Sequence, residues 1–493
     1  PYYIGDAITD PEELTLQTPE SFFKRFRINM KIHHEVISIH PERKTVSVKN
    51  LENGEIFEEN YDKLILSPGA KPTQPRLPGV GMDKLFTLRT VEDTFRIKEY
   101  INKNHPKSAV LAGGGFIGLE LAENLRELGM DVTIVQRPKQ LMNPFDPDMA
   151  SMIHNEMRKH GIKLVLGYTV EGFKEKDNGV EVLLKDNPSL QADMVVLAIG
   201  VTPDTVLAKE AGLELGIKES IVVNDRMETS VPDIYAAGDA VQVKHYVTGN
   251  DALISLAGPA NKQGRIIADN ICGGDSRYLG SQGSSVIKVF DMTAATTGIN
   301  ETNAKKSGLD VDTVILSPMS HAGYYPGGKV MTMKVVFEKE TYRLLGAQII
   351  GYEGVDKRID VLATAIHAGL KATQLKDLDL AYAPPYSSAK DPVNMAGFMI
   401  DNIAKGTLKQ WHLEDMDKIS RDKSVVLLDV RTVGEFNRGH MDGFKNIPVD
   451  ELRERINEIE KGKPVYLICQ SGLRSYIASR ILEGNGYETY NFS

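Results

Sequence analysis

The sequence predicts an α/β protein built from several domains. Its 493 residues exceed the ~300 residues at which a single hydrophobic core usually stops growing. Near residue 110, a short apolar strand leads through a glycine turn into an amphipathic helix. A separate strand, loop and helix pattern occupies residues 425–482. Strands that alternate with helices in this way are typical of sheets covered by helices.

Composition and charge exclude several classes of protein. Hydrophobic residues make up 41% of the chain and charged residues 25%, the usage of an ordinary soluble protein. The net charge of −9 and the lack of a long basic run argue against nucleic acid as a partner. No stretch reaches the ~20 apolar residues that cross a bilayer, so we expect no membrane partner. Two widely separated cysteines, Cys272 and Cys469, indicate a reducing compartment, and we expect the cytoplasm.

Residues 1–104 alternate short strands, such as Thr45–Val48 and Leu64–Leu66, with turns and helical stretches. The strand before Ser67 ends in a turn that contains Gly69, a place where backbone can meet a ligand. The N-terminus has neither the basic region nor the apolar segment of a signal peptide. Because it also lacks an initiator Met, we expect the chain to be a fragment.

The glycine turn after Val110–Ala112 has the spacing Gly113-x-Gly115-x-x-Gly118. Gly113 permits a tight turn, Gly115 admits a pyrophosphate close to the backbone, and Gly118 allows the helix to pack on the strand. A second strand, Val132–Val135, follows at the spacing of a βαβ unit. We therefore predict dinucleotide binding here, the alternative being a chance glycine-rich turn.

The end of that second strand bears on the choice of nicotinamide nucleotide. A carboxylate at this point usually binds the ribose 2′-hydroxyl, whereas this chain has Gln136 and Arg137. Without the carboxylate a 2′-phosphate is not repelled, and Arg137 has the charge to pair with it. NADPH is thus as good a candidate as NADH, unless Arg137 is simply solvated.

Two further segments end in residues suited to a ligand. Met194–Gly200 has the pattern of a buried strand, followed by a turn at Val201–Thr205. A short apolar strand then leads to Ala236-Ala-Gly238-Asp239. Asp239 can accept hydrogen bonds from a polyol or ribose, and Gly238 lets a flat group lie close. The alternative is that Asp239 caps the following helix.

These segments together resemble a known family. Gly113–Gly118, Ser67–Pro72, Ala198–Gly200 and Ala236–Asp239 look like the motifs of the flavoprotein disulfide reductases that bind two dinucleotides. Within that superfamily, Pro1–Gly5 and Tyr382–Ser387 resemble the coenzyme A disulfide reductase and NAD(P)H-dependent persulfide reductase branch. The resemblance covers residues 1 to about 404.

The resemblance implies FAD and either NADH or NADPH as cofactors, with coenzyme A as substrate or ligand. It assigns the acid that matches Asp239 to the flavin ribityl chain, and it places a helix that starts near Leu256–Asn261 beneath the flavin pyrimidine ring. A helix N-terminus there would stabilise a reduced anionic flavin. The implied cofactor-binding residues are Gly69, Gly113, Gly115, Phe116, Ile117, Gly118, Gln136, Arg137, Gly200, Gly238, Asp239, Ala257 and Ala260. We predict no metal site.

The implied domains are two Rossmann-like domains, for FAD (1–104 and 215–284) and for NAD(P) (105–214), and an α+β dimerisation domain (285–405). The first FAD fingerprint and the redox cysteine of the family would precede Pro1, so we expect the FAD domain to be N-terminally incomplete. Cys272 ends a helix in the pattern, and we interpret it as a structural thiol rather than a substitute.

The predicted dimerisation domain has strands at 285–290, 330–337 and 344–350 and a helix at Val355–His367. By resemblance it forms a homodimer and lends residues to the partner's active site. The tyrosine that matches Tyr386 approaches the sulfur substrate, where a phenol can protonate a leaving thiolate. Tyr325 is a second candidate, and a packed tyrosine is the alternative for both. Lys71 and Lys357–Arg358 fit coenzyme A phosphates or, more simply, a solvated cationic surface.

Residues 406–493 predict a separate α/β module after a linker at Gly406–Gln410. The pattern gives a strand at Val425–Arg431, an amphipathic helix at Glu451–Glu460 and a strand at Val465–Ile468. That strand delivers the loop Cys469–Arg474 to the start of a helix, Ser475–Leu482. Backbone N–H groups and a helix N-terminus favour the thiolate of Cys469, which is the setting of a nucleophile.

These motifs, with Asp429-Val-Arg431 and Gly439-His440, resemble a rhodanese domain. The resemblance implies that Cys469 carries a persulfide and that the arginine matching Arg474 holds the loop and an anionic substrate. A phosphatase uses a related loop that is one residue longer, so it is the alternative. The usual last helix of the domain is missing after Ser493, and we expect truncation at this end too.

Three functions follow. The first is an FAD-dependent NAD(P)H reductase of coenzyme A persulfide, polysulfide or coenzyme A disulfide, with Cys469 as sulfur carrier. The fusion favours the persulfide over the disulfide, because a sulfur carrier has no evident use with the latter. The alternatives are an NAD(P)H oxidase or peroxidase of the same fold and a non-catalytic sulfur-binding protein.

Overall fold

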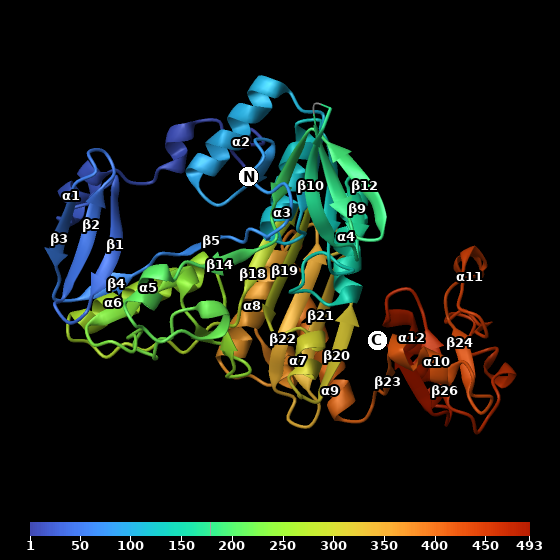
Figure 1. The fold of residues 1–493 in the computed structure, drawn as a ribbon. Helices are drawn as coiled ribbons and strands as arrows, with labels where there is room; N and C mark the ends of the chain where they lie inside the picture. Colours follow the sequence, from blue (N-terminus) through green and yellow to red (C-terminus); the bar gives the residue numbers. More distant parts are fainter. Residues whose placement is uncertain (178) are drawn as a thin grey trace. The chain divides into compact units, whose positions relative to one another are not determined.

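The computed structural model describes residues 1–177 and 179–493, which fold into two compact units (Figure 1). The first unit comprises Pro1–Asn143, Ala150–Gly283 and Ile287–Phe290, and the second comprises Pro144–Met149, Ser284–Val286 and Asp291–Ser493. The mixed α/β architecture that the sequence predicts is confirmed. In the described part of the chain, no helix is long and apolar enough to span a membrane.

A parallel sheet in the first unit has its strands in the order β6-β13-β7-β8-β9. The strands are β6 (Leu85–Thr87), β13 (Met194–Leu197), β7 (Ser108–Ala112), β8 (Asp131–Gln136) and β9 (Lys163–Leu166). Between β7 and β8 the chain passes through the predicted glycine turn into α3 (Phe116–Glu127). Apolar residues at helical spacing form this helix, and its Leu121 and Leu125 are fully buried.

Gly200 follows β13 with a φ of 111°, a conformation that suits glycine. Val201–Pro203 then forms β14, which pairs antiparallel with β5 (Ala70–Pro72). The prediction of a turn across Val201–Thr205 is therefore wrong in its first three positions.

An antiparallel sheet, β10-β11-β12, packs on the parallel one. Its strands are β10 (Val170–Lys176), β11 (Gly179–Leu184) and β12 (Asn187–Ala192). Phe173 and Val182 share a core with Val110 and Val195 of the parallel sheet. Every second side chain of β11 is buried, so one face of the strand packs against this core.

The remainder of the first unit contains an antiparallel sheet, β1-β2-β3, and the pairs β4-β15 and β16-β17. These strands are β1 (His34–His40), β2 (Thr45–Asn50), β3 (Ile56–Asn60), β4 (Leu64–Leu66), β15 (Ile234–Ala236), β16 (Val243–Lys244) and β17 (Asp251–Ala252). The helices are α1 (Pro19–Phe26), α2 (Val91–Asn104), α5 (Val206–Glu210) and α6 (Ala257–Ile271). Ile221, Ile234 and Ile267 belong to a core that packs β1, β2, β15, α5 and α6 together. Helix α4 spans Pro147–Lys159.

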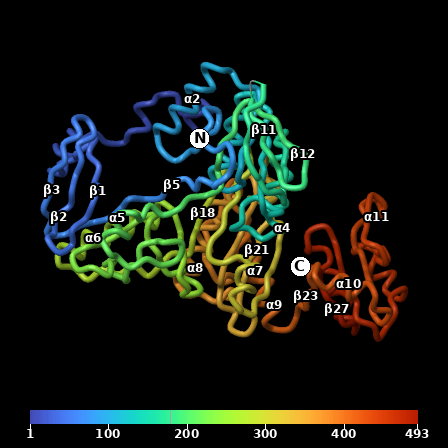
Figure 2. The backbone as a smooth tube through the Cα atoms, in the orientation of Figure 1, coloured from blue at the N-terminus to red at the C-terminus, as the bar shows by residue number. Residues whose placement is uncertain are grey.

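In the second unit a sheet has the order β18-β19-β22-β21-β20. Its strands are β18 (Ser285–Val289), β19 (Met292–Gly298), β22 (Leu344–Gly351), β21 (Met331–Glu338) and β20 (Val311–Leu316). Helix α8 (Val355–His367) packs on β19 and β22, and α9 (Pro392–Ala404) packs on β20. Figure 2 follows this backbone from β18 to α9 in yellow and orange. The predicted strands and helix are confirmed, and a short helix, α7 (Glu301–Lys306), joins β19 to β20.

The C-terminal module is a parallel sheet in the order β23-β27-β26-β24-β25. Its elements are β23 (Gln410–Trp411), α10 (Met416–Ile419), β24 (Val426–Asp429), α11 (Val433–Arg438), β25 (Lys445–Asn446), β26 (Val465–Ile468), α12 (Leu473–Glu483) and β27 (Thr489–Phe492). Short 3-10 turns, two of them in this module, span Pro11–Leu14, Ile217–Glu219, Gly238–Ala240, Ala372–Asp377, Leu413–Asp415 and Ile456–Glu458.

The predicted helix at Glu451–Glu460 is wrong. The segment consists of successive turns and one 3-10 turn, held by main-chain bonds such as Leu452 N–H to Val449 O. Leu452 and Ile459 are both buried, at the spacing that suggested a helix. Consecutive turns bury the same residues, so the apolar pattern did not distinguish the two conformations.

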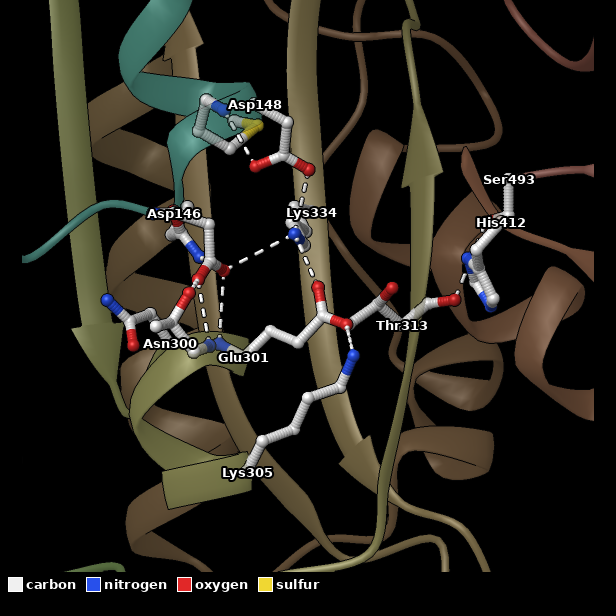
Figure 3. A network of polar contacts seen from close by, with 12 residues as sticks. Asp146, Asp148, Asn300, Glu301, Lys305, Thr313, Lys334, His412 and Ser493 are labelled. Carbon is white, nitrogen blue, oxygen red and sulfur yellow. Dashed lines mark hydrogen bonds and ion pairs between the residues drawn. The ribbon is translucent and has the colours of Figure 1, made fainter. Parts of the chain in front are cut away.

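A buried lysine ties the segment Pro144–Met149 to the sheet of the second unit (Figure 3). The Lys334 ammonium on β21 lies 3.3 Å from Asp146, 2.7 Å from Asp148 and 2.7 Å from Glu301. Burial alone would lower the pKa of Lys334, but these carboxylates outweigh it and raise the pKa above its ordinary value. The cluster therefore stays ionised although Lys334 is only 2% exposed.

Candidate functional site

Each glycine of the loop after β7 has its own structural reason. Gly113 has a φ of 118°, and a Cβ there would lie 2.1 Å from the Ala198 carbonyl oxygen. A Cβ on Gly118 would lie 2.2 Å from the Gly113 carbonyl oxygen, so glycine lets α3 approach β7. At Gly115, no heavy atom of the described residues comes within 4 Å of such a Cβ. The backbone at Gly115 is therefore open to a ligand.

Helix α3 starts at this opening without a side-chain cap. Gly115 is exposed, and Phe116 and Ile117 in the first turn are half-buried. Gly200, at the end of the neighbouring strand, is exposed as well. Uncapped N–H groups at a helix N-terminus attract an anion, so the residues present fit the pyrophosphate of a dinucleotide.

Gln136 and Arg137 differ in what they contact. The Gln136 side-chain oxygen accepts a hydrogen bond of 3.1 Å from the Gly114 N–H, so it braces the glycine loop. Arg137 is exposed at the end of β8. The structure thus places a neutral, engaged side chain and a solvent-accessible cation where a carboxylate often stands.

A second cluster joins the Gly69 turn to Asp239. The Arg89 guanidinium donates to Asp239 at 2.8 Å and to the Ala70 carbonyl oxygen at 3.0 Å. The Gly238 N–H donates to Gln263 at 2.7 Å. Asp239 lies inside a 3-10 turn and pairs with Arg89, so the alternative that it caps a helix is wrong.

The start of α6 faces the same cluster. Ala257 begins the helix after Leu256, and no side chain caps it. A Cβ placed on Gly238 would lie 4.0 Å from the Cβ of Ala260. Small residues beside an uncapped helix start leave room for a flat anionic ring, so these residues fit a flavin.

A cavity of about 420 Å³ lies in the second unit beside α8. Its lining includes Tyr382, Tyr386, His321, Glu353 and Lys357. The Tyr386 side chain is 71% exposed, which contradicts the alternative of a packed tyrosine. Tyr325 is 43% exposed and packs edge-on against His321, with ring centroids 5.5 Å apart. The cavity thus combines phenols with a cation.

Lys357 and Arg358 do not form a common cationic surface. Arg358 is 1% exposed and binds Asp391 at 3.0 Å and the Ser387 hydroxyl at 3.1 Å. It supports the loop that carries Tyr386, whose carbonyl oxygen it also contacts at 3.2 Å. The interpretation of Arg358 as solvated is therefore wrong. Lys71 is half-exposed and pairs with Asp204 at 3.0 Å.

Cys469 lies where β26 ends, with only 9% of its surface exposed. Its sulfur accepts hydrogen bonds from the Gly472 N–H at 3.1 Å and from the Ser475 hydroxyl at 3.2 Å. Gly472 has a φ of 86°, which turns its N–H back toward the sulfur. Two donors aimed at one sulfur can hydrogen-bond the negative charge that a reacting sulfur carries, and this geometry suits a nucleophile.

Arg474 forms a two-point ion pair with Glu435, at 2.7 and 2.8 Å. The Thr432 hydroxyl and N–H also donate to Glu435. The Arg474 guanidinium and these donors hold the pKa of Glu435 well below its usual range. Arg474 is therefore fixed to α11, which holds the loop in shape.

The sequence interpretation missed Arg89, Gln263, Glu435 and Ser475. Arg89 and Gln263 lie far along the chain from the residues they contact, so no local signal marks them. Ser475 directly follows Arg474, and its place in the first turn of the helix was a usable signal. Cys272 is exposed at the end of α6, and its interpretation as a structural thiol rather than a redox cysteine stays a prediction. Among the described residues, no group of three or more His, Cys, Asp or Glu is placed to hold a metal ion.

Three family models match the chain. Residues 3–264 match the pyridine nucleotide-disulphide oxidoreductases, and residues 284–392 match the dimerisation domain of the same family. Residues 412–493 match the rhodanese-like domain. The matched segments contain the glycine loop, the Tyr386 cavity and the Cys469 loop, respectively.

Individual proteins resemble the chain over most of its length. A coenzyme A disulfide reductase of Staphylococcus aureus is 37% identical over 399 residues, which cover 81% of this chain and 89% of the relative. The crystal structure of reduced CoADR-RHD of Bacillus anthracis has a TM-score of 0.97 and 47% identity, covering 100% of this chain and 88% of that one. The structure of a NAD-dependent persulfide reductase from A. fulgidus has a TM-score of 0.91 and 38% identity, covering 100% and 90%.

Proposed function

The chain belongs to the pyridine nucleotide-disulphide oxidoreductases, the family that includes coenzyme A disulfide reductase, and we propose that it reduces sulfur–sulfur bonds with NAD(P)H. Its substrate is coenzyme A persulfide or a polysulfide, with coenzyme A disulfide as a second substrate of the same class. The observation that carries this proposal is the Cys469 loop, a sulfur-carrying geometry in the same chain as a dinucleotide fold. The protein works as a homodimer in the cytoplasm.

The proposed domains are FAD-binding (1–104 and 215–284), NAD(P)-binding (105–214), dimerisation (285–405) and rhodanese (406–493). When bound, FAD would supply the redox chemistry that links the nicotinamide to sulfur. The chain's own residues bind and orient: the α3 start and Gly115 receive the NAD(P) pyrophosphate. Arg89 holds Asp239 in place for the ribityl hydroxyls, and the start of α6 supports the flavin ring.

Tyr386 donates a proton to the thiolate that leaves the substrate. Its exposed side chain lines the cavity beside Lys357, whose charge suits an anionic coenzyme A group. Tyr325 packs edge-on against His321, which lines this cavity, and assists substrate binding. Arg358 contributes indirectly, because its hydrogen bond to the Tyr386 carbonyl oxygen fixes the loop that carries this tyrosine.

The proposed substrate is tested with the purified full-length protein. We expect NAD(P)H oxidation to be faster with coenzyme A persulfide than with coenzyme A disulfide, and slow with oxygen alone. Equal rates with oxygen alone would instead identify an NAD(P)H oxidase or peroxidase. Sulfur bound at Cys469 without any NAD(P)H oxidation would identify a sulfur-binding protein.

Arg137 is proposed to bind the 2′-phosphate of NADPH. Because Gln136 is neutral and engaged with the glycine loop, it does not repel that phosphate. We expect Arg137→Ala to lower kcat/KM for NADPH by about 10- to 100-fold, the effect of a lost charged hydrogen bond. The kcat/KM for NADH should stay within about threefold of the wild-type value, because NADH has no 2′-phosphate.

Lys139→Ala is the matched control, because Lys139 is also an exposed cation and lies two residues further on. Lys139→Ala should change kcat/KM for NADPH and for NADH by less than about twofold, because a surface charge that does not pair with the phosphate has a weak effect. If Arg137→Ala leaves the NADPH kinetics unchanged, Arg137 is only a solvated surface residue.

A further inference from the structure

The Ser475 hydroxyl has two acceptors within reach. Ser475 lies in the first turn of α12 and is fully buried. Its Oγ is 3.2 Å from the Cys469 sulfur and 3.0 Å from the Gly472 carbonyl oxygen. A hydroxyl has one proton, so it donates to one of these acceptors at a time.

We propose that Ser475 is a catalytic residue of the carrier loop, whose hydroxyl donates to the Cys469 thiolate and turns to the Gly472 carbonyl when Cys469 carries a sulfane sulfur. The inference rests on the proposed sulfur-carrier function. A thiolate is a charged acceptor and forms the stronger hydrogen bond. In the persulfide the negative charge lies on the terminal sulfur, and Sγ becomes a weak, thioether-like acceptor.

Two cations of the C-terminal module near this loop are each paired with a carboxylate. Arg474 is paired with Glu435 of α11, and Arg431 is paired with Asp429 at the end of β24. Each of these cations thus has a carboxylate partner that offsets its charge. The core beside Cys469 is apolar, with the side chains of Leu428, Val430 and Ala478. Arg474 still interacts electrostatically with Cys469, but the hydrogen bonds to the sulfur come from the Ser475 hydroxyl and the Gly472 N–H.

The Ser475 hydrogen bond accelerates the release of sulfur from Cys469 more than any other step. An acceptor thiolate attacks the terminal sulfur of the Cys469 persulfide, and the bond between Sγ and that sulfur breaks. The electron pair of the broken bond stays on Sγ, and the sulfur leaves as the persulfide of the acceptor, so total charge and oxidation state are conserved. As negative charge returns to Sγ, the Ser475 hydroxyl turns back to it. This hydrogen bond is stronger in the transition state than in the persulfide, so it accelerates release.

The direct test is the pH profile of Cys469 alkylation by iodoacetamide in the full-length protein. Mass spectrometry of the tryptic peptide that ends at Arg474 follows Cys469 separately from other thiols. We expect Ser475→Ala to move the midpoint of the profile upward by about one pH unit, the size of one lost charged hydrogen bond. Ser475→Thr retains the hydroxyl and should restore the midpoint.

Single-turnover transfer gives a second readout. We expect Ser475→Ala to slow the release of sulfur from preloaded Cys469 to cyanide about tenfold. The rate at which thiosulfate loads Cys469 should be lower in Ser475→Ala only below the midpoint of the alkylation profile. At high pH it should match the wild-type rate. Ser479→Ala is the matched control, because Ser479 is buried on the same helix but donates to the Tyr476 carbonyl oxygen.

The outcomes separate the inference from the function on which it rests. If Ser475→Ala leaves the alkylation midpoint in place, or if Ser479→Ala moves it equally, Ser475 is a packing residue and the inference is wrong. If the midpoint moves but the wild type transfers no sulfur to cyanide, the hydroxyl–thiolate contact stands and the carrier function fails.

Discussion

Replacement of Cys469 by serine is expected to lower sulfur transfer from thiosulfate to cyanide by about 1,000-fold or more. A serine hydroxyl stays protonated at neutral pH, so the loop loses its nucleophile while its shape is kept. NAD(P)H-dependent reduction of an artificial dye should continue at the wild-type rate, because it needs no sulfur carrier. Thiocyanate formation and dye bleaching, measured on the same preparation, give the two rates.

Cys272→Ser is the matched control for this experiment. Cys272 is exposed at the end of α6, whereas Cys469 is buried in the loop with two donors on its sulfur. The control should retain both activities. Sulfur transfer that survives Cys469→Ser would place the carrier at another thiol, and loss of dye reduction would show that the substitution disturbs more than the loop.

Local patterns predicted much of the fold. The β7, α3 and β8 segments follow from apolar periodicity and from the spacing of Gly113, Gly115 and Gly118. Strand β26 and helix α12 follow from the same kind of signal around Cys469. In these places the conformation is set by neighbours in the sequence, and a pattern can report it.

Contacts between distant residues could not be predicted in this way. Arg89 and Asp239 are separated by 150 positions, and Glu435 and Arg474 by 39. A charged residue carries no periodic signal, so its partner emerges only when the fold brings the two together. Lys357 and Arg358 show the limit most directly, because adjacent cations on α8 differ in exposure. The helical rotation of about 100° per residue turns Arg358 toward buried Asp391.

Lys334→Met is expected to destabilise the sheet of the second unit by about 3–5 kcal/mol, the cost of leaving a buried charge without its partner. Methionine fills a similar volume, so the loss comes from charge rather than from a cavity. The main-chain N–H of Thr302 and the amide of Gln348 still bind Asp146, but neither neutralises it. Amide hydrogen exchange of β21 and β22 measures the change in opening free energy.

Lys305→Met is the matched control within the same cluster. The Lys305 side chain is 45% exposed while it pairs with Glu301 and Glu414 (Figure 3 shows the Glu301 contact). A solvent-exposed pair contributes little, so we expect a loss of less than about 1 kcal/mol. Equal losses in the two variants would show that burial of Lys334 does not determine the stability of the cluster.

The pH dependence of the Lys334→Met effect identifies its cause. In the wild type, burial alone would raise the pKa of Asp146, but Lys334 and the hydrogen bonds from Thr302 and Gln348 lower it below its ordinary value. The pair therefore stabilises the fold fully above about pH 4, the range of an unfolded aspartate, and this contribution is lost as pH falls through the lowered pKa. In Lys334→Met the attraction of Lys334 is lost while Asp146 stays buried, so we expect the pKa of Asp146 to rise and protonation to relieve the variant as pH falls from 7 toward 4. We expect the loss of stability caused by Lys334→Met to be smaller at pH 5 than at pH 7. Adding Asp146→Asn should reduce this loss at pH 7. A loss that is the same at both pH values and in the double variant would mean that side-chain shape, not the unpaired carboxylate, causes it.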